Sequence, residues 1–277
     1  MVAAMSQSEL LKNQGWALIL GASSGFGEAV GTTLARAGMN IIGIHLDRRA
    51  TMPNVERIKG EIEKQGRQAW FYNMNAADEA KRRSTLDEIK QRLSDSGSDD
   101  KIQVMLHSLA FGTLKPYWNE GSKDEELINR SNIDMTLDVM AHSLVYWSQD
   151  VMRRQLFGKQ ARIYAMTSSG STSVWQGYGA VSAAKAALES HIRQLAVELA
   201  PHHVTCNAIC AGVTDTPALR KIPGHEGMIE TATNRNPNKR LTTPQDIANS
   251  LVALSTPATQ WINGNTIYVD GGEEISG

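Results

Sequence analysis

Short apolar runs alternate with longer stretches that are apolar at helical spacing along most of the chain. Because strands are short and helices are longer, the runs predict buried strands and the stretches between them predict amphipathic helices. We expect strands at residues 16–20, 40–44, 69–72, 102–106, 163–168, 204–208 and 262–272. We expect helices at residues 28–37, 55–65, 79–93, 128–156, 180–200 and 244–254.

Strands that alternate with helices in this way indicate the α/β fold class. The order predicts one doubly wound, Rossmann-type domain, with a seven-stranded parallel sheet, helices on both faces and ligands at the carboxyl ends of the strands. A chain of 277 residues that is 41% hydrophobic can bury one substantial core and does not need two, so we expect a single domain over residues 1–277. Residues 1–14 form a polar N-terminal arm in this interpretation, and residues 217–240 form a mobile flap over a substrate.

Charge and composition argue against several kinds of partner. A formal net charge of −1 gives no general attraction to nucleic acid or to an anionic membrane. No apolar run approaches the roughly 18 residues of a membrane span, and the N-terminus lacks the features of a signal peptide. Cys206 and Cys210 are the only cysteines, and they suggest neither a disulfide framework nor a zinc site. We expect a cytoplasmic protein without a resident metal.

Three glycines connect the first expected strand to the first expected helix. Their spacing, Gly-x3-Gly-x-Gly, differs from the commoner Gly-x-Gly-x-x-Gly. Glycines let the backbone approach a pyrophosphate, and the helix N-terminus supplies free N–H groups and a positive dipole. A plain tight turn is the alternative, but the flanking strand and helix favour a dinucleotide site. Its candidate residues are Gly21, Ser23, Ser24, Gly25, Phe26 and Gly27.

The end of the second expected strand should meet the adenosine ribose of that dinucleotide. An acidic residue at the tip favours a free 2′-hydroxyl, whereas a nearby arginine favours a 2′-phosphate. His45 occupies the tip, and Asp47, Arg48 and Arg49 lie just beyond it. We therefore expect NADP(H) to be favoured over NAD(H), with His45 and Arg48 at the ribose. A merely solvated turn is the alternative interpretation of these charges.

Three more strand ends should reach the same edge of the sheet. Asn75 and Ala76 follow the third strand, where an adenine ring could be contacted. His107 ends the fourth strand, and we expect a buried, hydrogen-bonded histidine there rather than a catalytic one. The turns after the fourth and sixth strands contain small residues that let a cofactor pass close to the backbone. Their candidate residues are Ser108, Leu109, Ala110, Gly212, Val213, Thr214 and Thr216.

A tyrosine and a lysine stand seven residues apart in the alanine-rich helix expected near residues 180–200. At about 100° per residue, seven positions return to nearly the same face, about 10 Å further along the axis. Lys185 leans toward the helix N-terminus, so it can lower the pKa of the Tyr178 phenol and hold a ligand between the two. The fifth strand delivers Ser168 to the same edge. A surface lysine and a half-buried tyrosine are the alternative when the pair is taken alone.

The helices expected at residues 128–156 and 180–200 carry more apolar surface than one sheet face needs. The stripe on the first includes Met135, Val139, Leu144 and Trp147. Core and subunit interface explain such a stripe better than a cofactor site. We therefore expect a homotetramer, or a dimer, formed through these two helices.

These motifs together resemble the short-chain dehydrogenase/reductase superfamily over essentially the whole chain. The glycine turn, the tyrosine–lysine pair, the Gly212 turn and the sequence Val269-Asp-Gly-Gly272 occur in the order typical of that family. The family usually has its tyrosine four residues before the lysine, where this chain has Val181. Tyr178 lies seven before it, which is the spacing of the enoyl-acyl-carrier-protein reductase branch.

Further segments also resemble that branch, with one departure. The residues 107–110 read His-Ser-Leu-Ala where the wider family often has Asn-Asn-Ala-Gly, and Ala211-Gly212 stands in place of Pro-Gly. The segment that starts at Asp138 lacks the catalytic asparagine that the wider family usually carries there. Ser168 lies where classical members have a catalytic serine, whereas many enoyl reductases have a second tyrosine.

The resemblance implies an NADPH-preferring reductase of trans-2-enoyl thioesters in fatty-acid synthesis, acting on acyl carrier protein or coenzyme A esters. Tyr178 is then the hydrogen-bond donor to the enolate, Lys185 binds the nicotinamide ribose, and Ser168 is an auxiliary donor. In enoyl reduction the hydride lands two carbons away from the thioester carbonyl, which suits a tyrosine one helical turn further back. A carbonyl or 3-oxoacyl-thioester reductase and a dinucleotide-binding regulatory protein without turnover are the alternatives.

Overall fold

One parallel sheet of seven strands forms the centre of the computed structural model, which describes residues 15–96 and 100–276. The predicted arm at residues 1–14 lies outside the described residues. The strand order is β3-β2-β1-β4-β5-β6-β7, and every neighbouring pair is parallel. This confirms the predicted fold class. The strands are β1 Trp16–Leu20, β2 Asn40–His45, β3 Ala69–Asn73, β4 Ile102–His107, β5 Phe157–Ser168, β6 Thr205–Ala211 and β7 Thr266–Val269.

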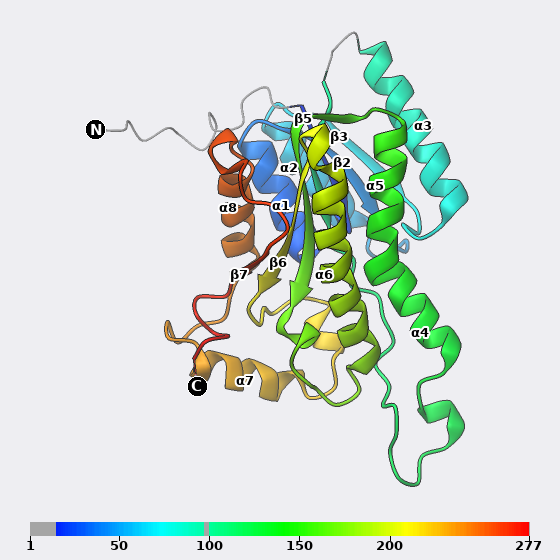
Figure 1. Ribbon diagram of the computed structural model, residues 1–277, viewed down its shortest axis with the longest axis vertical. Coiled ribbons are helices and arrows are strands. Elements are labelled where there is room, and N and C mark those ends of the chain that lie inside the picture. Colours follow the sequence, from blue (N-terminus) through cyan, green and yellow to red (C-terminus); the bar gives the residue numbers. More distant parts are fainter. Residues whose placement is uncertain (1–14, 97–99, 277) are drawn as a thin grey trace.

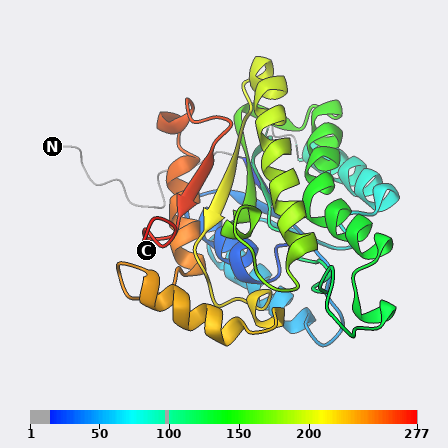
Figure 2. The same ribbon diagram turned by 60° about the horizontal axis from the view of Figure 1, so that its bottom comes forward.

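Helices cover both faces of the sheet, as Figures 1 and 2 show. One apolar core lies between the sheet and α1, α2 and α8, and a second lies between the sheet and α3, α5 and α6. The central strand β1 is buried on both sides, which explains its uninterrupted apolar run. The helices are α1 Gly25–Arg36, α2 Met52–Lys64, α3 Glu79–Asp95, α4 Arg130–Leu137, α5 Ser143–Arg153, α6 Gly179–Leu199, α7 His225–Arg235 and α8 Pro244–Leu254.

The strand order reverses beside β1, whose neighbours are β2 and β4. The chain runs outward to β3 on one side of this point and outward to β7 on the other. Connections on the two sides diverge there, and open α/β sheets generally bind ligands in a crevice at such a point, here the carboxyl ends of β1 and β4. The glycine turn after β1 lies at this position.

The long helix predicted at residues 128–156 is interrupted. A π-helical turn, Asp138–His142, separates α4 from α5, and α5 already ends at Arg153. Both halves keep an apolar face toward the core, so the periodicity of the sequence did not reveal the extra residue in the turn.

The seventh strand is also shorter than predicted, because residues before it are held in a turn by asparagine side chains. Cys206 N donates to Asn263 Oδ1 over 2.8 Å, and Asn265 N donates to Asn207 Oδ1 over 3.1 Å. These bonds fix the chain beside β6 before regular pairing starts at Thr266. The strand therefore begins four residues later than the apolar pattern predicts.

A buried ion pair joins α3 to α5 on the second face. Arg82 Nε donates to Asp150 Oδ2 over 2.8 Å, and only 5% and 3% of the two side chains are exposed. Asp150 also interacts with Arg153 and Arg154. Loss of Arg82 would leave Asp150 with Arg153 and Arg154 from its own segment but would remove the buried charged hydrogen bond between the two helices, so the fold depends on this contact.

Candidate active site

The glycine turn after β1 has the conformation that its sequence predicts. Gly21 and Gly25 have φ angles of +92° and +55°, where side chains are unfavourable. A Cβ atom on Gly27 would collide with the carbonyl oxygen of Gly21. The first helix starts at Gly25, so its unpaired N–H groups open toward this turn. Free N–H groups at a helix N-terminus are suited to a pyrophosphate, which is the group the sequence predicts there.

The turn after β6 lies against the glycine turn, although nearly 190 residues separate them along the chain. A Cβ atom on Gly25 would lie 3.6 Å from Thr216 Cγ2. Thr214 and Thr216 are both buried, and Thr214 Oγ1 donates to Gly212 O over 2.9 Å. The two turns therefore lie side by side at the carboxyl edge of the sheet, where the sequence predicts a dinucleotide.

Tyr178 and Ser168 meet at the end of β5. Tyr178 is the residue immediately before α6, and a Cβ atom on Gly170 would lie 2.6 Å from the Tyr178 ring and 3.2 Å from Ser168 Oγ. Burial raises the pKa of the Tyr178 phenol, and a polar contact with Ser168 partly opposes this. The contact is not a full hydrogen bond, since the buried Ser168 Oγ has no partner among the described residues. The Ser168 hydroxyl therefore lies beside the phenol without a hydrogen-bond partner of its own in the described residues.

Lys185 lies beneath the same strand end. Its side chain is buried, and Nζ donates to Met166 O over 2.7 Å. An ammonium has three donors, so this bond leaves two for a ligand. Burial lowers the pKa of Lys185 to about 8, and the negative charge of Glu189 opposes the shift. Lys185 is thus largely protonated at pH 7, which suits a group that binds ribose hydroxyls.

His107 is not part of this donor set. The ring is fully buried at the end of β4, and Nε2 lies 2.8 Å from Ser143 Oγ. Because Ser143 Oγ donates to Val139 O, the ring nitrogen is the donor to Ser143. Burial, with a contribution from Lys185, lowers the pKa of His107 to about 3. A neutral structural histidine agrees with the sequence-based expectation.

A carboxylate, Asp47, lies two residues beyond the end of β2, as the sequence places it, and its side chain turns back toward His45. Asp47 Oδ2 lies 3.0 Å from His45 Nδ1, and the backbone N–H of Asp47 donates to Asn73 Oδ1. Burial alone would raise the pKa of Asp47, but polar contacts with Ser23, Thr51 and His45 lower it. An ionised carboxylate therefore lies beside the glycine turn. Arg48 and Arg49 are exposed next to it.

The remaining predicted cofactor residues lie at the same edge but differ in exposure. Ser108 N donates to Leu20 O, and a Cβ atom on Gly21 would overlap Ser108 O. Ala110 is exposed, and Leu109 is half-buried. Asn75 is exposed, whereas Ala76 is buried and its carbonyl accepts a hydrogen bond from Trp147 Nε1. Ala76 can thus contribute backbone or methyl surface only.

The predicted flap is partly ordered, since it contains the helix α7, and the chain after β7 is joined to it. Arg235 Nη2 donates to Glu274 O over 2.7 Å, and Asn236 Nδ2 donates to Asp270 O over 2.8 Å. The C-terminal segment, residues 270–276, also contacts the turn after β6. Val213 N donates to both carboxylate oxygens of Glu273, each over 3.2 Å. The sequence analysis missed Glu273, whose carboxylate fixes the Gly212 turn by accepting from the backbone of Val213.

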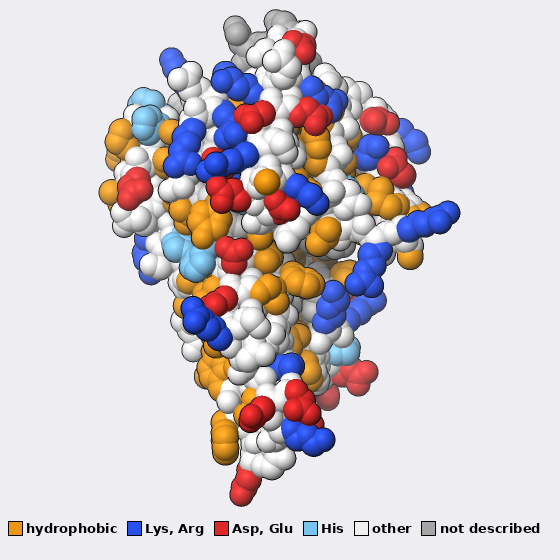
Figure 3. Space-filling view, turned by 90° about the vertical axis from the view of Figure 1, so that its right-hand side faces the viewer, with side chains coloured by type: hydrophobic (Ala, Val, Ile, Leu, Met, Phe, Trp, Pro, Cys, Tyr) orange, Lys and Arg blue, Asp and Glu red, His pale blue; other side chains and the backbone are white. Residues whose placement is uncertain are grey.

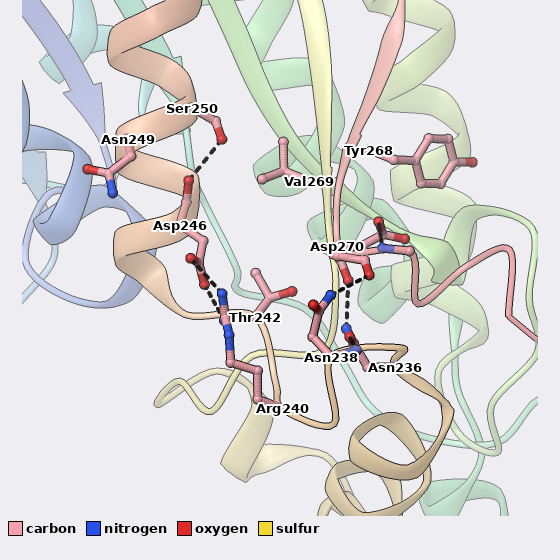
Figure 4. A pocket seen from close by; sticks show the side chains of 12 residues that line it. Asn236, Asn238, Arg240, Thr242, Asp246, Asn249, Ser250, Tyr268, Val269 and Asp270 are labelled. Atoms are coloured by element: carbon pink, nitrogen blue, oxygen red, sulfur yellow. Dashed lines mark hydrogen bonds and ion pairs between the residues drawn. The ribbon is translucent and has the colours of Figure 1, made fainter. Parts of the chain in front are cut away.

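A polar hollow of about 510 Å³ lies on the other side of that turn, between α8 and β7. Figure 4 shows the ion pair of Arg240 with Asp246 on one wall, and Asn236 and Asn238 on the other. Neither Tyr178 nor Lys185 lines it. The hollow is therefore separate from the crevice in which the predicted catalytic residues meet.

The described residues contain no cluster of histidine, cysteine and carboxylate side chains that could hold a metal ion. No helix in residues 15–96 or 100–276 is both long and apolar enough to cross a membrane. The thiols of Cys206 and Cys210 are buried in β6, and burial raises the pKa of the Cys210 thiol to about 12.

Comparisons with known proteins agree with this geometry. The family model of the enoyl-(acyl carrier protein) reductases matches residues 21–274. A 1-cyclohexenylcarbonyl-CoA reductase of Streptomyces collinus is 26% identical over 93% of this chain and 86% of its own. The NADH-dependent enoyl-[acyl-carrier-protein] reductase of Aquifex aeolicus is 29% identical over 64% of this chain and 63% of its own.

Structural similarity extends over nearly the whole fold, and other activities occur among the relatives. A Bacillus cereus enoyl-acyl carrier protein reductase, solved with NADP+ and an indole naphthyridinone, has a TM-score of 0.84 at 22% identity, with 97% and 99% of the two chains covered. A 2,3-dihydro-2,3-dihydroxybenzoate dehydrogenase of Bacillus subtilis is 26% identical over 94% of this chain and 95% of its own. The chain belongs to the enoyl-(acyl carrier protein) reductase family of the short-chain dehydrogenase/reductase superfamily, and it is an NAD(P)H-dependent oxidoreductase.

Proposed function

We propose that this oxidoreductase reduces the carbon–carbon double bond of trans-2-enoyl thioesters in fatty-acid synthesis in the cytoplasm. The observation that carries the proposal is the placement of Tyr178 and Lys185. Tyr178 precedes the first turn of α6 and is partly buried, and Lys185 lies two turns further on and is buried beside the end of β5. A phenol one turn further back than in carbonyl reductases can reach an oxygen two carbons away from the atom that accepts hydride.

Three side chains have separate roles in the proposed reaction. When bound, NAD(P)H supplies the hydride. Tyr178 donates a hydrogen bond to the thioester oxygen as negative charge develops there, and the raised pKa of its phenol keeps the proton in place at neutral pH. Lys185 binds ribose hydroxyls and adds a positive charge to the same region. Ser168, whose buried Oγ has no partner among the described residues, is the auxiliary donor.

Carbonyl reduction is the second candidate, and one observation favours it. Ser168 and Tyr178 lie side by side, so the two hydroxyls could hold the oxygen of one ketone, as the serine and tyrosine of classical members do. The superfamily relatives named as dehydrogenases also fit such chemistry.

A direct comparison of two thioesters separates the two candidates. We expect oxidation of NADPH, followed by its absorbance, when crotonyl thioester is added, and much slower oxidation with acetoacetyl thioester. Carrier-protein and coenzyme A esters are compared in parallel, and we propose that the carrier-protein ester is preferred. Turnover of acetoacetyl thioester alone would overturn the enoyl assignment.

The preference between NADPH and NADH should depend on the arginines and the aspartate that follow β2, which carry opposite charges. We propose that NADPH is preferred, because the exposed Arg48 and Arg49 have no ion-pair partner in the described part of the chain and can bind a 2′-phosphate. Asp47 opposes this preference, since its carboxylate repels a phosphate and accepts a hydrogen bond from a free 2′-hydroxyl. NADH should therefore also be accepted.

Substitutions at these positions should change the ratio of kcat/KM for the two cofactors in opposite directions. Arg48→Ala should reduce the NADPH-to-NADH ratio about tenfold, the effect of losing one charged hydrogen bond. Asp47→Asn should raise the ratio. If Arg48→Ala leaves the ratio unchanged while Asp47→Asn raises it, the carboxylate alone sets the preference and the proposed role of Arg48 is wrong.

We propose a homotetramer, or a dimer, as the assembled form, with α4, α5 and α6 at the interface. Figure 3 shows apolar side chains among charged ones on the side of the molecule that faces right in Figure 1, where α4 and α5 lie. Val197 on α6 is 73% exposed in the single chain. Light scattering at micromolar concentration should give the mass of two or four chains, and a mass of 30.3 kDa would contradict the proposal.

A further inference from the structure

A buried cation needs a nearby opposite charge, and Lys185 has no ion pair in the described residues. Its Nζ has one protein partner, the carbonyl of Met166. Transfer of an ammonium into a protein interior is costly unless it is paired, and an unpaired lysine tends to lose its proton. The cofactor-binding role that we propose for Lys185 requires the protonated form. Some neighbouring group must therefore supply negative charge.

Glu189 is placed to do so. It lies four residues after Lys185 on α6, which puts the two side chains on one helix face about one turn apart. Two successive residues of β5 hold the pair: Met166 O accepts from Lys185 Nζ over 2.7 Å, and Thr167 Oγ1 donates to Glu189 Oε1 over 2.6 Å. The Thr167 hydroxyl thereby keeps the carboxylate against the sheet instead of in solvent.

The other titratable groups around Lys185 are uncharged at neutral pH. From β4, His107 has a pKa of about 3, and from β6, Cys210 has a pKa of about 12. Tyr178, at the start of α6, keeps its proton because burial raises its pKa. Among the described residues, Glu189 is the one carboxylate whose charge raises the pKa of Lys185.

We propose that Glu189 is a positioning residue of the active site: its carboxylate, fixed by Thr167, is the counter-charge that keeps the buried Lys185 ammonium protonated. This inference rests on the proposed role of Lys185 as the cofactor anchor. The contact is electrostatic and not a closed ion pair, so the ammonium keeps free N–H donors for ribose hydroxyls. A direct ion pair would occupy those donors.

The test is the titration of Lys185 itself, followed by NMR of the full-length protein labelled with [13C]lysine and assigned with Lys185→Arg. The wild-type resonance should titrate near pH 8. In Glu189→Gln the midpoint should fall by about one pH unit, because an opposite charge at close range is lost. Glu189→Asp should retain most of the wild-type value. Glu198→Gln is the matched control on α6, since that side chain bonds to Gln194.

Cofactor affinity gives a second readout. If the ammonium binds the ribose, Glu189→Gln should weaken NADPH binding about fivefold at pH 8 and little at pH 6, where both proteins are protonated. Unchanged titration of Lys185 in Glu189→Gln would overturn the proposal. A shifted titration without a pH-dependent change in affinity would uphold Glu189 as the counter-charge and overturn the cofactor role of Lys185. If Glu189→Gln fails to fold, Thr167→Val tests the same link: the proposal requires a lower midpoint, and an unchanged one overturns it.

Discussion

Replacement of Tyr178 by phenylalanine is expected to lower kcat for crotonyl thioester about 10²- to 10³-fold. In the proposed reaction the phenol donates to the oxygen on which negative charge develops, and phenylalanine keeps the ring while it removes that donor. Cofactor affinity should change little, since Lys185 and the glycine turn remain. Initial rates and the dissociation constant of NADPH measure the two effects separately.

Tyr268→Phe is the matched control, because Tyr268 lies half-exposed on the edge strand β7, away from the crevice. It should leave kcat unchanged. A Tyr178→Phe protein whose kcat stays within threefold of the wild type would show that another group stabilises the enolate. Ser168→Ala would then be the next variant to measure, since Ser168 is the hydroxyl beside the phenol.

Arg82→Met is expected to produce the largest loss of stability, about 1.5–3 kcal/mol in the free energy of unfolding, the effect of losing a buried hydrogen bond between charged groups while Arg153 and Arg154 still face Asp150. Methionine fills much of the space of the arginine stem but leaves the buried Asp150 carboxylate without the guanidinium that links α3 to α5. Urea denaturation followed by circular dichroism measures the change. Arg83→Met is the control: the Arg83 side chain is 54% exposed and, among the described residues, its ion-pair partner is Glu79, so we expect a loss of less than about 1 kcal/mol.

The pH dependence of this loss follows from Asp150. Burial would raise the pKa of its carboxyl, but hydrogen bonding to Arg82 and the charges of Arg82 and Arg154 lower it below 3.8. A lowered pKa in the folded state stabilises the fold above the pKa of the unfolded chain, and the contribution disappears as pH falls through the folded value. The difference between wild type and Arg82→Met should therefore shrink toward pH 3. An equal difference at pH 3 and pH 7 would contradict the assignment.

The sheet could be predicted because each strand is a separate apolar run bounded by turn residues. Both faces of β1, β4 and β5 are covered, so these strands need no polar alternation and their runs are easy to see. The π-helical turn at Asp138–His142 could not be predicted, since one extra residue in a turn leaves apolar side chains facing the core on both sides. The start of β7 could not be predicted either, because it depends on hydrogen bonds of Asn263 and Asn265 with β6, which is distant in the sequence.

For the site, local motifs predicted the positions that a single segment defines. The glycine turn and the spacing of Tyr178 and Lys185 are of this kind. The contact of Asp47 with Ser23 could not be predicted, because it depends on how two turns fold together. Glu273 lies 60 residues after the backbone group that it binds, so no local pattern pointed to it.

The link between Glu273 and Val213 has a consequence for the order in which the protein forms during translation. Synthesis proceeds from the N-terminus, so the Gly212 turn leaves the ribosome well before its supporting carboxylate exists. Sixty further residues must be made first. The glycine turn, by contrast, depends on β1, β2 and β4, which emerge early. A nascent chain should therefore complete the glycine turn before the Gly212 turn has its full support.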